Sequence, residues 1–372
     1  MASNILPSSG SLKFSHYTKT SFILHKISEQ KVQTLISKLD EKKAIRHGDI
    51  PTKFFKLSNS VVTPFLTHIF NRCMTEGIYP NYLKEAQIVP LRKSGDSTIC
   101  SNYRLISLLS QFNEIFEKLL HARLYGYLKD FGLLSEHQCG FQPNSSKAFA
   151  VEDIYFNLLA NHDEGLHTCS LFINCSKAFD NVNHEIIFKK MEMNFGIRGI
   201  PLMLMKSYLT NRGQFTLVQN MASKINKITC GVPQGSTLGP LFFIMYVNDL
   251  PKCSSFSIKL YADDTYLCLA HGDLKQFKLM VNNELIKVDE WMRLNKLSIN
   301  YAKSMYFLTG KSFNKAEEEK KNFKINIKNV VLHRKTSVQY LGVLLDESLN
   351  WTSHVKYLKS KLSFASSMIY KI

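Results

Sequence analysis

Two adjacent carboxylates, Asp263 and Asp264, lie between short segments rich in Ile, Leu, Tyr and Thr. Such segments favour β-strands, so the sequence predicts a hairpin over residues 257–269 with both acids at its tip. Adjacent carboxylates repel each other, and divalent cations such as Mg²⁺ relieve that repulsion by binding their oxygens. Aspartate is also common in ordinary turns, so the pair alone leaves a metal site and a solvated turn as alternatives.

The elements expected to position these acids combine helices with strands. Apolar residues recur at helical spacing over residues 112–120 and 274–292, which predicts two amphipathic helices. Further helices are expected after Phe179 and after Pro240, the latter because proline suits a first helical turn. Strands are predicted over residues 167–173, 214–219 and 225–229. Mixed elements of this kind indicate an α+β or an α/β fold.

The composition indicates a globular protein that binds a polyanion. The chain has 372 residues, which suggests two or three structural units. Its 47 Lys and Arg against 30 Asp and Glu give a net charge of +17, and 45% of its residues are hydrophobic. That hydrophobic content is too high for a disordered basic tail. A nucleic acid is therefore a natural partner, because backbone binding needs many cations.

Several other classes of protein are excluded or disfavoured. The longest apolar run, residues 241–247, is too short for a membrane span, and the Ser-rich start lacks the core of a secretory signal, so we expect an intracellular protein. The eight cysteines form no C-x-x-C pair, which favours buried free thiols over zinc or disulfide sites. No Walker loop, nucleophile elbow or zinc-binding H-E-x-x-H helix is present.

Seven stretches between residues 44 and 358 resemble, in the same order, the reverse transcriptase of non-long-terminal-repeat retrotransposons of the jockey-like or long-interspersed-element class. They are IVPLRKSGDSTICSNYRLISLL (88–109), QCGFQ (138–142), FINCSKAFDNVNH (172–184), GVPQGSTLGP (231–240), YADD (261–264), WMRLNKLSINYAKS (291–304) and YLGVLLDESLNWTSH (340–354). The resemblance implies a right-hand polymerase of α+β class, with fingers, a ferredoxin-like palm and the beginning of a thumb. It also implies RNA-templated synthesis of DNA from a DNA primer and deoxynucleoside triphosphates, with Mg²⁺ or alternatively Mn²⁺ as cofactor.

The same resemblance implies a division of the chain. Residues 1–43 form a weakly patterned extension with a mobile start, 44–167 the fingers with part of the palm, 168–345 the palm with the catalytic motifs, and 346–372 the start of a truncated thumb. The charged stretch 311–328 is expected to be a surface connector. An active copy is expected to work in the nucleus, and nothing in the sequence sets the oligomeric state.

By the resemblance, three carboxylates hold two metal ions, and this chain has two of them. Asp263 and Asp264 match two of the acids, whereas Asn174 stands where the family has the third. An amide offers a carbonyl oxygen but no charge, so metal occupancy is expected to fall. At tenfold per 1.36 kcal/mol, the rate is expected to drop by roughly a hundred- to ten-thousandfold. Asp180 is expected on the following turn, away from the metals.

The nucleotide-binding residues implied by the resemblance are Lys93, Arg104, Phe179, Gln234 and Gly235. The two cations would bind the triphosphate, because an anionic leaving group needs fixed positive charge. Phe179 would lie under the sugar and exclude a 2′ hydroxyl. The loop with Gln234 and Gly235 would approach the template–nucleotide pair closely, which a Cβ would obstruct. Taken singly, each of these residues could instead be a surface cation, a core aromatic or part of a plain turn.

Three further positions complete the expectations. Lys303 matches a lysine thought to protonate the departing pyrophosphate, although a phosphate-contacting or merely exposed lysine is the alternative. Gln142 replaces the usual Arg of G-F-R and Leu105 the usual Pro after Arg104, so nucleotide affinity is expected to suffer. Two other functions remain open: a catalytically inactive nucleic-acid-binding protein with the polymerase fold, and a template-independent or RNA-primed polymerase.

Overall fold

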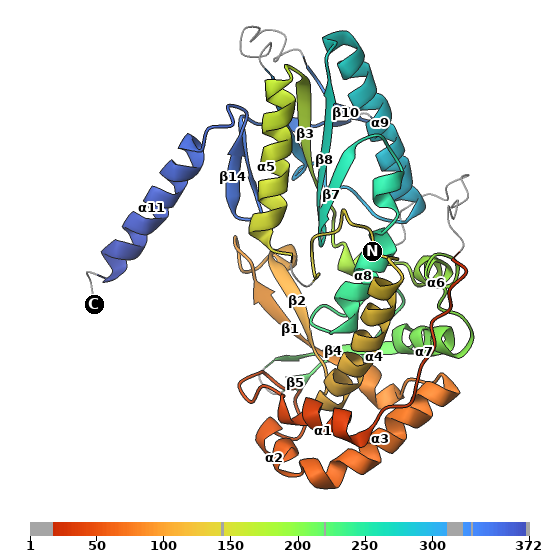
Figure 1. The fold of residues 1–372 in the computed structure, drawn as a ribbon. Helices are drawn as coiled ribbons and strands as arrows, with labels where there is room; N and C mark the ends of the chain where they lie inside the picture. Colours follow the sequence, from red (N-terminus) through yellow and green to blue (C-terminus); the bar gives the residue numbers. More distant parts are fainter. Residues whose placement is uncertain (1–17, 143–144, 219–220, 311–322, 329, 370–372) are drawn as a thin grey trace.

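The computed structural model describes residues 18–142, 145–218, 221–310, 323–328 and 330–369 and has an α+β fold (Figure 1). Its α-helices are α1 (Glu29–Ser37), α2 (Thr52–Leu57), α3 (Asn59–Glu76), α4 (Gln111–Asp130), α5 (Lys147–Asp163), α6 (His184–Met193), α7 (Gly199–Leu209), α8 (Leu238–Val247), α9 (Leu274–Leu294) and α11 (Thr352–Ile369). Its strands are β1 (Glu85–Arg92), β2 (Tyr103–Leu108), β3 (His167–Asn174), β4 (Arg212–Val218), β5 (Met221–Ala222), β6 (Asn226–Ile228), β7 (Ser257–Tyr261), β8 (Asp264–His271), β9 (Met305–Thr309), β10 (Asn326–Ile327), β11 (Val330–Val331), β12 (His333–Arg334), β13 (Ser337–Tyr340) and β14 (Val343–Asp346).

The sheet that carries the paired carboxylates has the strand order β12-β9-β3-β8-β7. The pairs β9·β3, β3·β8 and β8·β7 are antiparallel, and β12 runs parallel to β9. Strand β3 is central and buried along almost its whole length, because both faces of the sheet are covered. Its sequence HTCSLFIN therefore lacks the alternation of apolar and polar residues that is typical of a strand with one solvent-exposed face.

Different elements cover the two faces of this sheet. On one face Phe172 and Tyr266 pack with α5 and with the hairpin β13–β14. On the other face Leu171 and Leu267 join the large core that includes α9. Figure 1 shows α5 and α9 running alongside the strands and α11 projecting away from the body. Because successive side chains along a strand point to opposite faces, Phe172 packs against α5 and its neighbour Leu171 packs toward α9.

A second sheet has the order β2-β1-β4-β5, with β6 also paired to β4. Strand β1 is antiparallel to β2 and parallel to β4. The sheet thus combines strands from the segment 44–167 with strands from the segment 168–345, across the boundary expected from the sequence. Figure 1 places α1, α2 and α3 near this sheet, at the end of the molecule away from β3 and β8.

Most of the elements expected from the sequence are present. The helices over 112–120 and 274–292 and the hairpin over 257–269 correspond to α4, α9 and β7–β8. The helix expected after Phe179 begins later, at His184, because residues 179–181 form a 3₁₀ turn and the Asn183 side chain caps α6. All eight cysteines are free, and Cys100 is exposed, against the expectation of burial.

The expectation of a surface connector over residues 311–328 is wrong for its end. Residues 311–322, like residues 1–17, lie outside the described part of the chain. From 323 onwards Phe323, Ile325 and Ile327 are buried and alternate with exposed residues. That period of two is typical of a strand edge packed on a core, and charge density concealed it in the sequence. Among the described residues, no helix has the length and apolar character needed to cross a membrane.

The buried ammonium group of Lys190 links the helices α6, α8 and α9. Lys190 of α6 donates from Nζ to the Tyr246 carbonyl and to Asp249 Oδ1, both at 2.6 Å. The same nitrogen lies 4.9 Å from the centre of the Trp291 ring of α9. Burial lowers the pKa of Lys190, and Asp249 acts in the opposite direction by favouring the charged form. Asp249 is therefore the counter-ion on which this contact depends.

We expect Asp249→Asn to lower the free energy of unfolding by about 3 kcal/mol, because it leaves a buried charge without its partner. Urea denaturation measures the change. The control is Glu41→Gln, which breaks the more exposed ion pair with Lys56 and is expected to cost less than about 0.5 kcal/mol. Equal losses for the two variants would contradict the importance given to burial.

Candidate active site

The adjacent carboxylates occupy the turn between β7 and β8. Tyr261 and Asp264 are opposite each other in the register, so Ala262 and Asp263 form a two-residue loop. Ala262 has a φ of 58°, a left-handed conformation more often supplied by glycine or asparagine in such hairpins. Both aspartates are half-buried. The turn therefore holds two carboxylates close together in a partly enclosed position.

Asn174 is the last residue of β3 and lies directly opposite Asp264 in the antiparallel register. Directly opposite residues point to the same face, with Cβ atoms about 4.5–5.5 Å apart. The Asn174 N–H donates to Ser304 Oγ at 3.2 Å, and its carbonyl accepts the Asn300 N–H at 2.8 Å. The structure thus brings residue 174 beside the aspartate pair, with its backbone held from the other side.

Two residues that sequence reasoning did not assign to this site flank it. The alternation along β3 and β8 puts Asn174 and Asp264 on the face covered by α5 and by the β13–β14 hairpin. Burial raises the pKa of Asp264, and the charge of Lys147, the first residue of α5, partly opposes that rise. The buried Tyr340 hydroxyl has no hydrogen-bond partner among the described residues, and burial followed by the charge of Asp264 raises its pKa. Neither charge effect has a signal in the sequence, because each acts between segments that are far apart in the chain.

The electrostatics of the turn are those of crowded, partly buried carboxylates. Burial and then the charge of Asp263 raise the pKa of Asp264. Burial also raises the pKa of the neighbouring Cys175 thiol to about 12, helped by both aspartates, so the thiol stays protonated. Among the described residues, no three His, Cys, Asp or Glu side chains form a metal-binding group. The donors are two carboxylates and one amide oxygen, which suit a hard divalent cation but supply only two negative charges.

The loop 231–239 packs tightly against the protein's own backbone. Gly231 has a φ of 87°, and an added Cβ would lie 2.7 Å from the Asp180 carbonyl oxygen. Gly235 has a φ of 107°, and its Cβ would lie 2.9 Å from the Ser107 carbonyl oxygen. From the sequence, the loop with Gly235 is expected to approach a ligand closely. The structure adds an intramolecular reason for both glycines, since the loop is wedged between residue 180 and β2.

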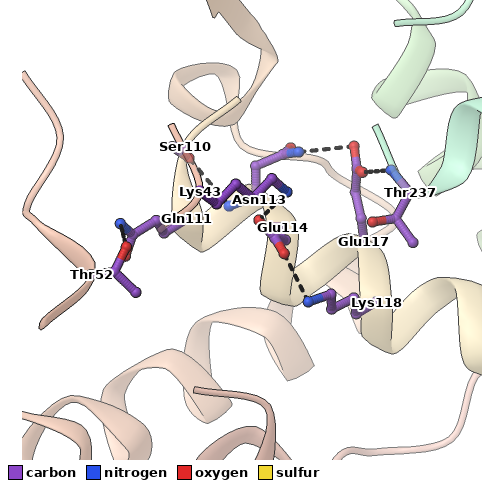
Figure 2. A network of polar contacts seen from close by, with 9 residues as sticks. All are labelled: Lys43, Thr52, Ser110, Gln111, Asn113, Glu114, Glu117, Lys118 and Thr237. Carbon is purple, nitrogen blue, oxygen red and sulfur yellow. Dashed lines mark hydrogen bonds and ion pairs between the residues drawn. The ribbon is translucent and has the colours of Figure 1, made fainter. Parts of the chain in front are cut away.

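Hydrogen bonds hold the same loop from both sides. Gln234 donates from Nε2 to Asp180 Oδ1 at 3.0 Å, and its carbonyl accepts the Ser107 N–H at 2.7 Å. Figure 2 shows the other anchor, where Glu117 Oε2 accepts the Thr237 N–H at 2.5 Å. The fully buried Glu117 also accepts the Asn113 amide at 2.8 Å in the same view. A buried carboxylate whose oxygens accept several hydrogen bonds makes a rigid support.

The two candidate cations lie on the β1–β2 ribbon. Arg104 is opposite Leu91, and the Lys93 N–H bonds the Asn102 carbonyl just beyond the register. Alternation puts Lys93 on the same side as Leu91 and hence as Arg104, and both cations are exposed. Burial raises the pKa of Asp180, while Lys93 is among the groups that lower it. Lys93 therefore lies near Asp180, which accepts the hydrogen bond from Gln234.

The remaining candidates occupy different surroundings. Phe179 is half-buried, stacks on Phe243 with ring centres 4.6 Å apart and meets the edge of Phe141 at 6.1 Å. Lys303 is exposed, and its N–H bonds the Asn300 carbonyl at 3.1 Å within the turn that holds Asn174. Gln142 is half-buried at the border of the undescribed residues 143–144. Asn174 and Lys303 thus lie on the side of Asp264, whereas Lys93 and Gln234 both lie near Asp180.

Comparison with known proteins gives a consistent result. The family model described as reverse transcriptase (RNA-dependent DNA polymerase) matches residues 91–345. In Drosophila melanogaster, the probable RNA-directed DNA polymerase from transposon BS is 27% identical over 301 residues, 78% of this chain and 33% of that protein. The probable RNA-directed DNA polymerase from transposon X-element is 26% identical over 89% of this chain and 36% of its own length. The RNA-directed DNA polymerase from mobile element jockey is 25% identical, with the same two shares. The chain spans about a third of the length of these relatives.

We expect Gly231→Ala to lower the free energy of unfolding by about 2 kcal/mol, because the new Cβ meets the Asp180 backbone and the positive φ is strained. Gly126→Ala is the control. Gly126 lies inside α4, and an added Cβ there has no neighbour within 4 Å. That variant is expected to stabilise the chain by about 0.5–1 kcal/mol. Chemical denaturation compares the two, and a stabilised Gly231→Ala would contradict the packing described.

We expect Asp264→Asn to raise the melting temperature of the metal-free chain at about pH 7 by about 2 °C. The raised pKa of Asp264 means that the folded state binds its proton more tightly than the unfolded state, so the charged carboxylate destabilises the fold above that pKa. The gain should shrink as the pH falls through the raised pKa of Asp264, because the folded wild type then becomes protonated. Thermal melts in chelator across pH measure this, with the exposed Glu136→Gln as the control. A constant or negative difference would contradict it.

Proposed function

The chain belongs to the reverse transcriptase family, and from this premise we propose that it is the RNA-directed DNA polymerase domain of a non-long-terminal-repeat retroelement, impaired in catalysis by Asn174. The observation that carries the proposal is the register that puts Asn174 opposite Asp264 beside Asp263. Its substrates are an RNA template, a DNA primer and deoxynucleoside triphosphates, and its place of action is the nucleus. The relatives named as RNA-directed DNA polymerases support this assignment.

The fold is consistent with a right hand. We assign the sheet β12-β9-β3-β8-β7 with α5 and α9 to a ferredoxin-like palm, and the β1–β2 ribbon with α2–α4 to the fingers. The projecting α11 is the beginning of the thumb (Figure 1). Along the chain this gives an extension over 1–43, fingers with part of the palm over 44–167, the palm over 168–345 and the thumb from 346. Strands β4–β6 belong to the proposed palm range 168–345 but join the sheet of the fingers, where β4 pairs with β1 and β6.

In this proposal the catalytic turn binds divalent cations with oxygen ligands. Asp263 and Asp264 supply carboxylates, and Asn174 supplies an amide oxygen from the opposite strand. Bound Mg²⁺, or Mn²⁺ in its place, would lower the pKa of the primer 3′ hydroxyl and neutralise charge that develops on the phosphate. The third ligand is neutral, so the site keeps two negative charges. We therefore expect metal affinity and rate to fall together.

The other residues bind and orient the nucleotide. Lys93 and Arg104 lie on one side of the fingers ribbon and offer fixed positive charge to the triphosphate. The Phe179 ring, held by Phe243, would oppose a 2′ hydroxyl on steric grounds. Gln234 and the adjoining Gly235 keep the loop backbone in a fixed position beside the base pair. Lys303, in the turn that holds Asn174, is the candidate proton donor to pyrophosphate.

A second candidate function is a nucleic-acid-binding protein that keeps this fold without catalysis. Asn174 and Gln142 favour it, because both remove charge that the reaction needs, while the net charge of +17 is enough to bind a phosphate backbone. The two functions differ in metal-dependent primer extension. Binding alone is retained by both and is expected to weaken as salt rises.

We expect Asn174→Asp to raise primer extension on an RNA template with Mg²⁺ by about a hundredfold or more, because it restores a carboxylate opposite Asp264. Single-turnover extension by the wild-type and variant chains measures the gain. The matched control is Asn157→Asp on α5, which adds the same charge near Cys268, several residues along β8 from the site. Robust extension by the wild type would contradict the impairment. No extension by either chain would favour the binding protein.

A further inference from the structure

The segment 137–140 covers the outer edge of β7, beside the turn that carries the aspartates. The Leu260 N–H donates to the His137 carbonyl at 2.8 Å, and the Cys139 N–H donates to the Leu260 carbonyl at 2.7 Å. Gln138 and Leu260 thereby form an isolated parallel bridge. The edge that would otherwise expose unpaired backbone groups is closed by this segment.

The Gln138 side chain reaches from this segment to the catalytic turn. It is 3% exposed, and its Oε1 accepts the N–H of Gly140 at 2.8 Å and the N–H of Ala262 at 3.3 Å. Its Nε2 is buried and has no hydrogen-bond partner among the described residues. The two accepted bonds fix which end of the amide faces the turn. A buried glutamine whose carbonyl serves the backbone of another element does more than fill space.

Gly140 brings the same segment into direct contact with the turn. A Cβ on Gly140 would overlap the backbone nitrogen of Ala262 and would lie 2.9 Å from the carbonyl carbon of Tyr261. These are backbone atoms, which cannot turn aside as a flexible side chain can. Because position 140 has no side chain, the Gln138 side-chain Oε1 and the Ala262 N–H can come within hydrogen-bonding distance.

The turn needs such support because of its own conformation. Ala262 adopts a φ of 58°, which costs energy for a residue with a Cβ and persists when the surroundings impose it. Asp263 and Asp264 follow directly and, half-buried, repel each other. If the backbone at Ala262 relaxed, both carboxylates would change direction. The hydrogen bond from the Ala262 N–H to the Gln138 side-chain Oε1 opposes that relaxation at Ala262 itself.

We propose that Gln138 is a positioning residue, whose side-chain carbonyl holds the left-handed turn at Ala262 and so keeps Asp263 and Asp264 in the geometry that binds a divalent cation. This inference rests on the proposed function and adds to it the residue that orients the Asp263 and Asp264 carboxylates. Gln138 itself touches neither the metal nor the substrates. Its effect on the reaction passes through the backbone of the turn.

The test is a titration of Mn²⁺ into the full chain carrying Asn174→Asp, with free Mn²⁺ followed by electron paramagnetic resonance. Gln138→Met keeps the length of the side chain and removes the carbonyl, so the Mn²⁺ dissociation constant should rise about tenfold, as for one lost hydrogen bond. Gln138→Glu keeps an acceptor oxygen, so its dissociation constant should rise by no more than about threefold above that of the parent. The control Gln276→Met, at an exposed site on α9, should leave the constant unchanged. In primer extension, Gln138→Met should lower kcat and leave KM for the nucleotide unchanged.

Several results would overturn the proposal: parent-like Mn²⁺ binding by Gln138→Met, equal losses in the Met and Glu variants, or no Mn²⁺ binding by the parent. If Gln138→Met fails to fold, Gly140→Ala decides, because it keeps Gln138 and displaces Ala262. Weakened Mn²⁺ binding by that variant supports the proposal, and unchanged binding overturns it. If the parent binds Mn²⁺ but extends no primer, the proposed polymerase function fails while the comparison of Gln138 variants still decides the positioning role.

Discussion

The antiparallel pairing of β3 with β8 is the constraint on which the candidate site depends. It puts residue 174 opposite Asp264, and the side-chain alternation that follows sends both residues to the face covered by α5 and the β13–β14 hairpin. A shift of β3 by one residue would send the Asn174 side chain to the other face, toward the core with α9 and away from Asp264. The buried residues on both faces of β3 oppose such a shift. The packing of the sheet therefore keeps the site in place even though Asn174 has lost the charge expected there.

The geometry around this pair is maintained largely by polar groups that do not belong to it. Gln138 supports the carboxylate turn from the edge of β7, and the turn with Asn300 and Ser304 holds the end of β3. The glycine loop has a separate support in Glu117, which is buried and bonded to the Thr237 backbone (Figure 2). The form of the site can thus persist without a carboxylate at position 174, because form and charge depend on different residues.

Charge at the turn has opposite consequences for stability and for metal binding. Burial and mutual repulsion raise the pKa of Asp264, so the metal-free fold bears a cost for keeping the aspartates together. A divalent cation would remove that cost by neutralising both. Aspartate at position 174 would increase both the repulsion and the affinity for the cation, whereas Asn174 makes the empty turn easier to fold. The residue that we propose weakens catalysis therefore also relieves repulsion in the metal-free fold.

The sequence by itself determined the family, the acids at the hairpin tip and most long elements, because periodicity and turn residues are local properties. Helices α4 and α9 and the hairpin β7–β8 lie where their residue patterns predict them. The tertiary structure alone decided the charge effects that link Lys147 and Tyr340 to Asp264, the hydrogen bond from the turn to Gln138 and the tight approach of Gly231 to Asp180. It also decided the burial of residues 323–327 and the late start of α6. These features join segments far apart in the chain, and their energies depend on distance and burial, which no local pattern encodes.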